Sequence, residues 1–290
     1  MAKVLNIIGP GRVGRTLGTL LQRTGLCAVQ DVLSAEMATA EAAVAFIGAG
    51  RAVRVLRDMR AAEFWLLTPP DAAIAPVAAA LAAADCVRKG DTVFHCSGAL
   101  SSAVLAPLAA AGAGIASVHP LKSFADPALA VQTFAGTHCA AEGDAAALSA
   151  LTPLFERLGA KLSVIDPSGK TLYHAASVLV CNDLTALMEA GLRAYEKAGI
   201  ERATAQTMME PLVRETIDNV FALGTTRALT GPVARGDAGV ITRQLAALES
   251  LDARIAAAYR ALNQIALDLA RAQGGASAAA LNAVAGALKK

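Results

Sequence analysis

The first 166 residues alternate short, uninterrupted apolar runs with Ala- and Leu-rich stretches of helical periodicity. The first run, residues 4–8, shows no apolar–polar alternation, as expected for a strand that is covered on both faces of a sheet. Val13, Leu17 and Leu21 then recur at helical spacing before Gly25 ends the pattern. Because this strand–helix unit repeats, the sequence predicts an α/β fold with a doubly wound, mostly parallel sheet.

The pattern changes after Pro167, so two domains are expected. Before it, further strands are predicted at residues 28–33, 64–67, 92–96, 115–118, 138–141 and 162–165, with helices at 71–84 and 144–158. After it, no strand is predicted, and helices are expected at 168–197, 201–222 and 242–272, with turns at 224–239 and a loosely packed helix in the tail from 274 to 290. These patterns predict a sheet domain over 1–166 and an all-helical domain over 167–290.

Charge and composition exclude several classes of protein. The 26 Lys and Arg residues nearly balance the 24 Asp and Glu residues, so the net charge of +2 favours neither nucleic acid nor an anionic membrane surface as a partner. A hydrophobic fraction of 55% with only 17% charged residues excludes a mainly disordered chain. The longest uncharged stretch, 92–121, is interrupted by Ser, Gly, Pro and His, and holds no apolar block near the ~20 residues of a membrane span.

The five cysteines are odd in number, widely scattered and never in a Cys-x-x-Cys pair. This spacing argues against a disulfide framework or a zinc site and favours a reducing cytoplasm. No pair of histidines has metal-ligand spacing, so no metal is expected.

A glycine-rich turn directly follows the first predicted strand and opens the first helix. It fits the G-x-G-x-x-G pattern, and its strand–turn–helix context favours a dinucleotide-binding site over an ordinary glycine-rich turn. The first glycine allows a tight turn, the second lets the backbone approach a pyrophosphate, and the third lets helix and strand pack closely. The predicted cofactor-binding residues of this turn are Gly9, Pro10, Gly11, Arg12, Val13 and Gly14.

The second strand bears on the choice between NAD and NADP. Asp31 has nearly the spacing of an acidic residue that bonds a ribose 2′-hydroxyl, but it falls inside the strand, and a surface charge is an equally good interpretation. The strand end carries Ser34, Ala35 and Glu36, and the only arginines nearby belong to the glycine-rich turn. The residues themselves therefore leave NAD and NADP open, with Ser34 as a candidate cofactor contact.

Three polar turns are expected at the carboxyl edge of the sheet, where open α/β folds bind their ligands. The first, residues 68–70, precedes Asp71, a good N-cap residue for the next helix. Residues 97–98 and 119–120 follow the next two strands. His119 is a candidate neighbour of the nicotinamide, although a histidine at a strand end is more often structural; His95 and His138 are expected to have no chemistry. The turns predict cofactor contacts at Thr68, Pro69 and Pro70, and substrate contacts at Ser97 and His119.

Three further segments go beyond this generic pattern: HPLKSF at 119–124, YHAA at 173–176 leading to Asn182, and TGPVARGD at 230–237. Together with the glycine-rich turn, over about residues 3–265, they resemble a family of oxidoreductases with a Rossmann-like N-terminal domain and a helical C-terminal domain of unknown function. That family is similar to the 6-phosphogluconate and β-hydroxyacid dehydrogenases, to pyrroline-carboxylate reductases and to deazaflavin-dependent NADP oxidoreductases. The resemblance implies that the helical domain, as that family defines it, starts near Gly136.

Two departures limit what the resemblance implies. Relatives carry a Ser-Arg pair at the end of the second strand, which suits NADP; Ala35 replaces that Arg, so NADP is favoured only slightly over NAD. The β-hydroxyacid dehydrogenases carry a catalytic Lys four residues before the Asn of the interdomain helix. Counting back from Asn182 reaches Val178, so that mechanism is not carried over.

His174 and Asn182 are the predicted catalytic residues. They lie eight positions apart, which places them on one face of a helix, and Lys170 lies one turn before His174. Because an imidazole exchanges protons near neutral pH, His174 is the candidate general acid or base, and the Asn182 amide would orient a substrate carbonyl. The alternative is a His and an Asn that form hydrogen bonds inside a helical interface.

The TGPVARGD segment holds the predicted anion clamp. Gly231 and Pro232 signal a turn and a helix start. The Arg235 guanidinium would bind a substrate carboxylate, with Asp237 to orient it. An Arg–Asp pair that stabilises a loop between helices is equally consistent with the sequence.

Together these inferences predict a cytoplasmic NAD(P)-dependent oxidoreductase that forms a homodimer through its helical domain. Hydride would move between nicotinamide and a small carbonyl, hydroxy acid or imine in an interdomain crevice, with neither nucleic acid nor a membrane as partner. Two alternatives stay open. The His119-Pro120 pair suggests a prephenate-like dehydrogenase, and the missing Lys at Val178 suggests a catalytically silent dinucleotide-binding sensor or scaffold.

Overall fold

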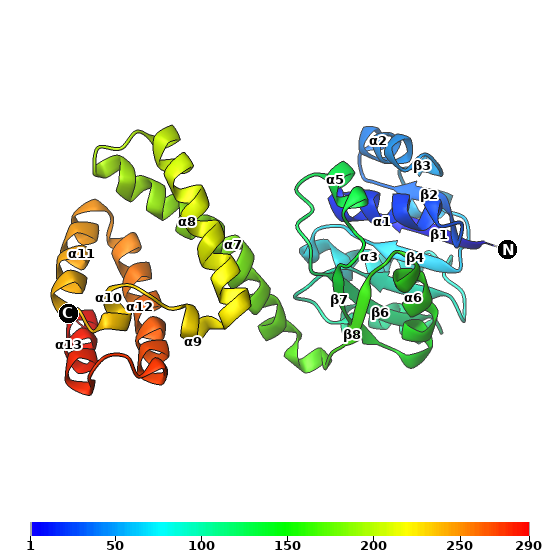
Figure 1. Cartoon of the computed structure of the whole chain (residues 1–290). Helices are drawn as coiled ribbons and strands as arrows, with labels where there is room; N and C mark the ends of the chain where they lie inside the picture. Colours follow the sequence, from blue (N-terminus) through cyan, green and yellow to red (C-terminus); the bar gives the residue numbers. More distant parts are fainter. Residues whose placement is uncertain (1, 290) are drawn as a thin grey trace. The chain divides into compact units, whose positions relative to one another are not determined.

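The computed structural model describes residues 2–289, which form two compact units that divide between Val180 and Cys181. The first unit contains the whole sheet, and the second is helical (Figure 1). The predicted α/β fold, a doubly wound sheet followed by an all-helical region, is confirmed. The division between the units falls inside a long helix, downstream of the boundary expected from the sequence pattern.

The sheet has eight strands in the order β3-β2-β1-β4-β5-β6-β7-β8. All neighbouring strands are parallel except β6 and β7, so the sheet is mostly parallel, as predicted. Seven strands were expected, and the three-residue edge strand β3 was not, because it is too short to show any periodicity. The strands are β1 (Lys3–Ile8), β2 (Cys27–Leu33), β3 (Arg51–Val53), β4 (Phe64–Leu67), β5 (Thr92–His95), β6 (Gly114–Pro120), β7 (His138–Gly143) and β8 (Lys161–Val164).

Helices cover both faces of this sheet, which explains the uninterrupted apolar runs. In β4, Phe64 and Leu66 belong to one buried cluster, while Trp65 and Leu67 belong to the cluster on the opposite face. The first cluster includes side chains of α1 (Arg12–Arg23), α2 (Met37–Ile47) and α6 (Ala145–Arg157). The second includes side chains of α3 (Asp71–Ala83), the 3₁₀ turn η2 (Ser102–Leu105) and α4 (Ala106–Ala110). The remaining short elements of this unit are η1 (Leu56–Asp58), α5 (Pro127–Gln132) and η3 (Pro167–Gly169).

Helix α7 (Lys170–Lys197) starts in the sheet unit and continues into the second unit. The other helices of the second unit are α8 (Arg202–Leu223), α9 (Thr225–Ala228), α10 (Pro232–Arg235), α11 (Ala238–Leu251), α12 (Ala253–Gln273) and α13 (Ala278–Lys289). One small core contains side chains of α7 and α8. A larger core contains side chains of α10, α11, α12 and α13.

Two predictions for the helical region were wrong. The single helix expected over 242–272 is broken at Asp252, whose backbone is extended and whose carboxylate accepts a hydrogen bond from the Arg254 N–H at 2.8 Å. Asp252 is therefore an N-cap and not an interior residue. The tail is not loosely packed either, because α13 buries Leu281, Val284 and Leu288 against its neighbours.

Among the described residues, one helical stretch, Pro167–Lys197, is long and apolar enough to cross a membrane by length and composition alone. About half of its apolar side chains are exposed, among them Leu172 (78%) and Val180 (75%). Its first turn, however, is packed onto the sheet through Lys170, which is buried.

Candidate functional site at the carboxyl edge of the sheet

The glycine-rich turn after β1 packs against the turn after β4. Gly9 has a φ of +76°, and a side chain there would overlap the Pro69 backbone. A side chain at Gly14 would overlap the Thr68 hydroxyl, which donates a hydrogen bond to the Gly9 carbonyl at 2.8 Å. The two predicted cofactor-binding turns, 9–14 and 68–70, therefore pack directly against each other, and glycine is needed at both positions for this contact.

The helix that starts from this turn has no side-chain cap. Gly11 is the N-cap residue of α1, no side chain of residues 2–289 bonds the first-turn N–H groups, and the first turn holds no acidic residue. The positive end of the helix dipole and its unsatisfied N–H groups therefore face outward. Around Gly11 a side chain would meet only the Gly9 carbonyl, at 4.0 Å, and Arg15 fixes the turn through the Pro10 carbonyl at 3.0 Å. These residues fit a dinucleotide pyrophosphate.

Neither interpretation of Asp31, ribose contact or surface charge, was right. The residue is fully buried in β2, where its carboxylate accepts hydrogen bonds from Arg51 (3.0 Å) and from Arg60 (2.7 Å). Burial opposes its ionisation, but the hydrogen bonds from both arginines outweigh burial and keep the pKa of Asp31 below its usual value. The residue stabilises the sheet and is not available to a cofactor.

At the end of β2 the structure adds a cation that sequence reasoning missed. The parallel pairing of Leu33 with Val53 and the hydrogen bond from the Ser34 N–H to the Val53 carbonyl (3.2 Å) place Ser34 beside Arg54. Arg54 is exposed, and it makes no ion pair or side-chain hydrogen bond among residues 2–289. A short strand without periodicity precedes it, so no sequence pattern aligned it with Ser34.

The turn after β5 is fixed by Ser97 and Asp71. Asp71 was expected to be an N-cap, but Pro70 takes that position, and the Asp71 carboxylate accepts a hydrogen bond from the Ser97 hydroxyl at 2.8 Å. The same hydroxyl accepts from the N–H groups of Ala99 and Leu100. Ser97 is thus buried with its hydrogen-bonding capacity used inside the turn, which argues against the substrate contact predicted for it.

His119, Tyr173 and His174 form a compact group, the histidine cluster, beside this turn. His119, near the end of β6 and not in a turn after it, shares a hydrogen bond with the Tyr173 hydroxyl through Nδ1 at 3.0 Å. The His119 ring centre lies 5.7 Å from those of both Tyr173 and His174. A side chain at Gly98 would overlap His174 Cδ2 and lie 2.8 Å from His119 Nε2. His119 and His174, both predicted from the sequence, therefore lie close together. Gly98, which follows β5, lies against both of their rings.

The protonation states of this cluster follow from its burial. Burial, and then the charges of His174 and Lys170, lower the pKa of His119 to about 4, so its ring is neutral at neutral pH. Burial raises the pKa of Tyr173 to about 12, so its hydroxyl keeps its proton. A phenol and a neutral imidazole can share one hydrogen bond in either direction, which leaves one His119 nitrogen to donate to or accept from a ligand.

The other two histidines lie on β5 and β7. His95 is fully buried; its Nδ1 accepts from the Ser97 N–H at 3.1 Å, so its Nε2–H donates to the Ser101 carbonyl at 3.2 Å. Burial and the charge of Lys170 lower the pKa of His95 to about 4. His138 is exposed on β7. Both are strand residues, as the sequence predicted.

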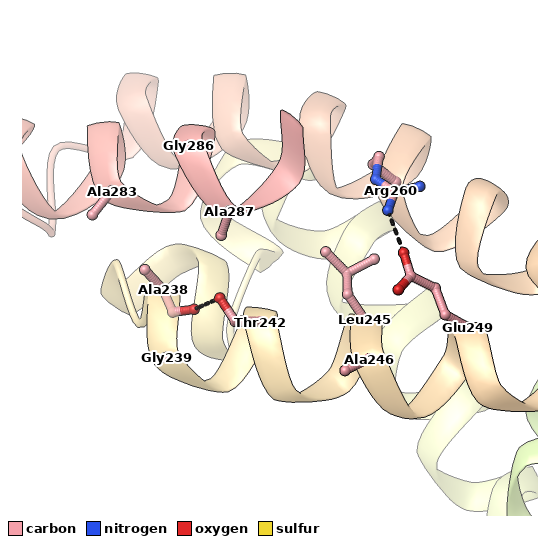
Figure 2. Close-up of a pocket in the computed structure, with 10 residues that line it drawn as sticks. All are labelled: Ala238, Gly239, Thr242, Leu245, Ala246, Glu249, Arg260, Ala283, Gly286 and Ala287. Atoms are coloured by element: carbon pink, nitrogen blue, oxygen red, sulfur yellow. Dashed lines mark hydrogen bonds and ion pairs between the residues drawn. The ribbon is translucent and has the colours of Figure 1, made fainter. Parts of the chain in front are cut away.

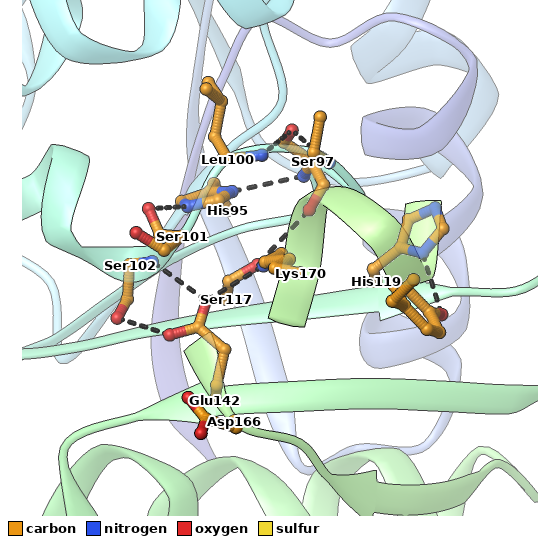
Figure 3. Close-up of polar contacts among 12 residues, drawn as sticks. His95, Ser97, Leu100, Ser101, Ser102, Ser117, His119, Glu142, Asp166 and Lys170 are labelled. Carbon is orange, nitrogen blue, oxygen red and sulfur yellow. Dashed lines mark hydrogen bonds and ion pairs between the residues drawn. The ribbon is translucent and has the colours of Figure 1, made fainter. Parts of the chain in front are cut away.

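A buried ion pair lies behind the histidine cluster, and sequence reasoning did not assign it. Lys170 Nζ donates to Glu142 on β7 at 2.9 Å and to the Ser117 hydroxyl on β6 (Figure 3). The side chains of Lys170 and Glu142 are each only 1% exposed. The Lys170 ammonium is therefore bonded inside the sheet unit. A Glu within the otherwise apolar run of β7 was the available signal, because buried charges need partners.

The remaining predicted residues belong to the second unit. Asn182 and Arg235 are exposed. Among the described residues Arg235 and Asp237 form no ion pair; Asp237 instead caps α11 by accepting from the Val240 N–H at 3.0 Å. The predicted turn and helix start are correct, since Pro232 begins α10 and Gly236 ends it in the left-handed conformation. The pairing expected between Arg235 and Asp237 was wrong because the carboxylate satisfies a helix N-terminus.

The second unit also has a pocket of about 510 Å³ between α11, α12 and α13 (Figure 2). Two of its polar groups are bonded within the unit: Arg260 Nη2 donates to Glu249 at 2.7 Å, and the Thr242 hydroxyl donates to the Ala238 carbonyl at 2.9 Å. The buried Arg260 Nε has no hydrogen-bond partner among residues 2–289. The rest of its lining is mostly Ala and Gly. None of the predicted site residues lines it.

Comparisons with known proteins agree with this architecture. Residues 2–120 match the family described as a Rossmann-like domain, and residues 137–265 match a domain of unknown function, DUF2520. The family predicted from the sequence motifs, which combines these two domains, is thereby confirmed. A search of curated proteins found no match.

Several solved structures share the fold. Protein TM1727 from Thermotoga maritima is 26% identical, with a TM-score of 0.72 over 93% of this chain and 99% of that one. A structure described as a putative NADP oxidoreductase from Bacteroides fragilis is 21% identical, with a TM-score of 0.72 over 91% and 97%. An imine reductase from a Pseudomonas species is 17% identical, with a TM-score of 0.67 over 92% and 94%.

Proposed function

We propose that the protein is an NAD(P)-dependent oxidoreductase whose cofactor lies along the carboxyl edge of the sheet. The observation that carries the proposal is that the uncapped start of α1 follows β1, while His119 of the histidine cluster lies near the carboxyl end of β6, a strand parallel to β1, so both lie at this edge. Ligands of open α/β sheets bind there. The names of the similar structures, an NADP oxidoreductase and an imine reductase, support the same class.

A bound nicotinamide would supply or accept the hydride. His174 then exchanges a proton with a substrate oxygen or nitrogen, and neutral His119, held by Tyr173, orients that atom by a hydrogen bond. The substrate class is a small carbonyl, hydroxy acid or imine. Asn182 and Arg235, both exposed, stay proposed substrate-binding residues.

We propose NADP over NAD as the coenzyme. The 2′-phosphate of NADP needs a hydroxyl or N–H donor and a cation. Ser34 and Arg54 offer this pair at the adjoining ends of β2 and β3. Arg54 would thus replace the Arg that relatives carry at the position of Ala35.

We also propose a cytoplasmic homodimer that associates through the helical unit. Large apolar side chains are exposed on its helices, including Phe221 (86%), Leu212 (58%) and Ile265 (62%). Such side chains mark interaction surfaces when they occur together. The five cysteines are all free, which supports a reducing compartment. Light scattering would test the dimer, with a Phe221→Ser variant expected to be monomeric.

A turnover screen tests the oxidoreductase directly. Reduced and oxidised NADP are each incubated with the protein and a panel of substrates. The panel contains small ketones, 2-hydroxy acids, cyclic imines and prephenate. Consumption or formation of reduced nicotinamide with one of the first three classes supports the proposal, and activity on the last alone supports the prephenate-like alternative. Saturable binding without turnover across the panel would instead support a silent dinucleotide-binding protein.

A further inference from the structure

Lys170 is a charged residue at the start of α7 that is almost completely buried. Burial of an unpaired ammonium costs several kcal/mol, so its surroundings must compensate for the lost water. They do: Nζ donates to Glu142 Oε1 at 2.9 Å and to the Ser117 hydroxyl. Glu142 in turn accepts from the Ser102 N–H (2.8 Å) and hydroxyl (2.7 Å). The pair is therefore a closed hydrogen-bonded unit that joins α7 to β6, β7 and η2.

The spacing along α7 connects this unit to the histidine cluster. Tyr173 and His174 follow Lys170 by three and four residues, so the three side chains share one face of the helix. Lys170 fixes the first turn to the sheet, and the next two side chains on that face then reach His119 and Gly98. If the first turn rotated or lifted, both contacts with His119 would be lost.

The ammonium also acts on the imidazoles by its charge. The ionisable groups around it are Glu142 on β7, His95 and Cys96 at the end of β5, Asp71 on α3 and His119 on β6. Burial is the main reason that the pKa of His119 is low, and the charges of His174 and Lys170 lower it further. Burial lowers the pKa of Lys170 itself, but its hydrogen bond and charge interaction with Glu142 oppose that shift, and Glu142 stays ionised because its pKa is lowered.

We propose that Lys170 is a positioning residue for the histidine cluster. Its ion pair with Glu142 holds the first turn of α7 on the sheet, and this fixes Tyr173 and His174 against His119. The consequence for catalysis rests on the proposed function; the consequence for the cluster does not.

The test measures two properties of the full chain. NMR of the imidazole rings gives the protonation midpoints of the four histidines, and steady-state kinetics gives the turnover. In Lys170→Met the midpoint of His119 is expected to rise by about one pH unit or more, because a neighbouring positive charge is removed. Turnover is expected to fall about tenfold or more, with the NADPH dissociation constant changed less than twofold. The control is Lys3→Met, which removes an exposed ion pair with Glu63 (2.9 Å) and should change neither property.

A second variant keeps the test decisive if Lys170→Met does not fold. Lys170→Met combined with Glu142→Leu removes both buried charges, and such replacements often preserve stability. The double variant is expected to fold and still to show the raised His119 midpoint and the reduced turnover. A wild-type His119 midpoint and wild-type turnover in the folded double variant would overturn the positioning role. Failure of the wild-type protein to bind a dinucleotide would overturn the proposed function alone, since the His119 midpoint is read without any cofactor.

Discussion

Two helix starts, one in each unit, look alike in the sequence and differ in the structure. Both follow a glycine-containing segment, GPG before α1 and RGD before α11. The first is uncapped and open around Gly11, whereas the Asp237 carboxylate caps the second and Gly236 packs against Ala280. A side chain at Gly236 would lie 2.6 Å from the Ala280 Cβ. One start leaves its N–H groups to a ligand, and the other satisfies them within the chain.

A sequence segment can be unusual without forming a binding site. The TGPVARGD segment is the more unusual pattern, yet Pro232, Gly236 and Asp237 are explained by the joint between α10 and α11. The common G-x-G-x-x-G pattern is the one that leaves an open site. The units differ in the same way in their charges: the sheet unit buries Asp31, Glu142 and Lys170, while the ion pairs around Arg202 and Arg214 in the helical unit are exposed.

The largest effect is expected from His174→Ala. Loss of the proton-exchanging group should reduce turnover by about 10²- to 10⁴-fold, with little change in the dinucleotide dissociation constant. Steady-state kinetics and a fluorescence titration measure the two quantities. His138→Ala, at an exposed histidine of β7, is the matched control and should keep full turnover. Loss of dinucleotide affinity together with turnover would show that His174 is misassigned.

The buried histidines predict how stability depends on pH in the sheet unit. Because burial lowers the pKa of His95 to about 4, the unfolded chain binds its proton at a higher pH than the folded chain does. The free energy of unfolding should therefore fall as the pH drops from about 6.5 to about 4, by up to about 3 kcal/mol from this residue. Urea unfolding at several pH values measures this. His95→Gln, which keeps a donor toward the Ser101 carbonyl, should flatten the dependence, and an unchanged slope would contradict the assignment.

A smaller effect tests the coenzyme preference at the ends of β2 and β3. Arg54→Ala should weaken NADPH binding about tenfold, or about 1.4 kcal/mol, and leave NADH binding unchanged. Arg57→Ala, at a nearby exposed arginine, is the control. Equal loss for both coenzymes, or no loss, would remove Arg54 from the 2′-phosphate site.

The smallest effect belongs to the capped helix start. Asp237→Ala removes the hydrogen bond to the Val240 N–H and should lower the free energy of unfolding by about 1 kcal/mol. Dinucleotide binding should not change. A large loss of binding with normal stability would mean that the TGPVARGD segment belongs to the site after all.

The sequence predicted the fold well because its signals are local. Uninterrupted apolar strands, helical periodicity and the glycine-rich turn each lie within a few residues, and seven of the eight strands were located from them. The helix break at Asp252 was missed because an Asp inside an apolar periodic pattern resembles an exposed helix position until its backbone is seen. The three-residue β3 was missed because it is shorter than any period.

The site was predicted less completely because its contacts join distant segments. His119 and His174 were both selected from the sequence, but their contact depends on where α7 starts relative to β6. Glu142 and Lys170 are 28 residues apart and form a pair only in the folded sheet unit. Asp31 was misjudged because its partners Arg51 and Arg60 follow it by 20 and 29 residues. Ionic partners at such separations leave no periodic signal.

The most direct test of the central claim is to give α1 the cap that α11 already has. Gly11→Asp is compatible with the backbone φ of −71° and with the open space around Gly11, so the protein should fold with equal or slightly greater stability. The new carboxylate would take the pyrophosphate position, and NADPH titration should show affinity reduced by at least about 100-fold, or about 2.7 kcal/mol. Gly275→Asp adds the same charge at an open position of the helical unit and should bind NADPH normally. Wild-type NADPH affinity in folded Gly11→Asp would contradict the account.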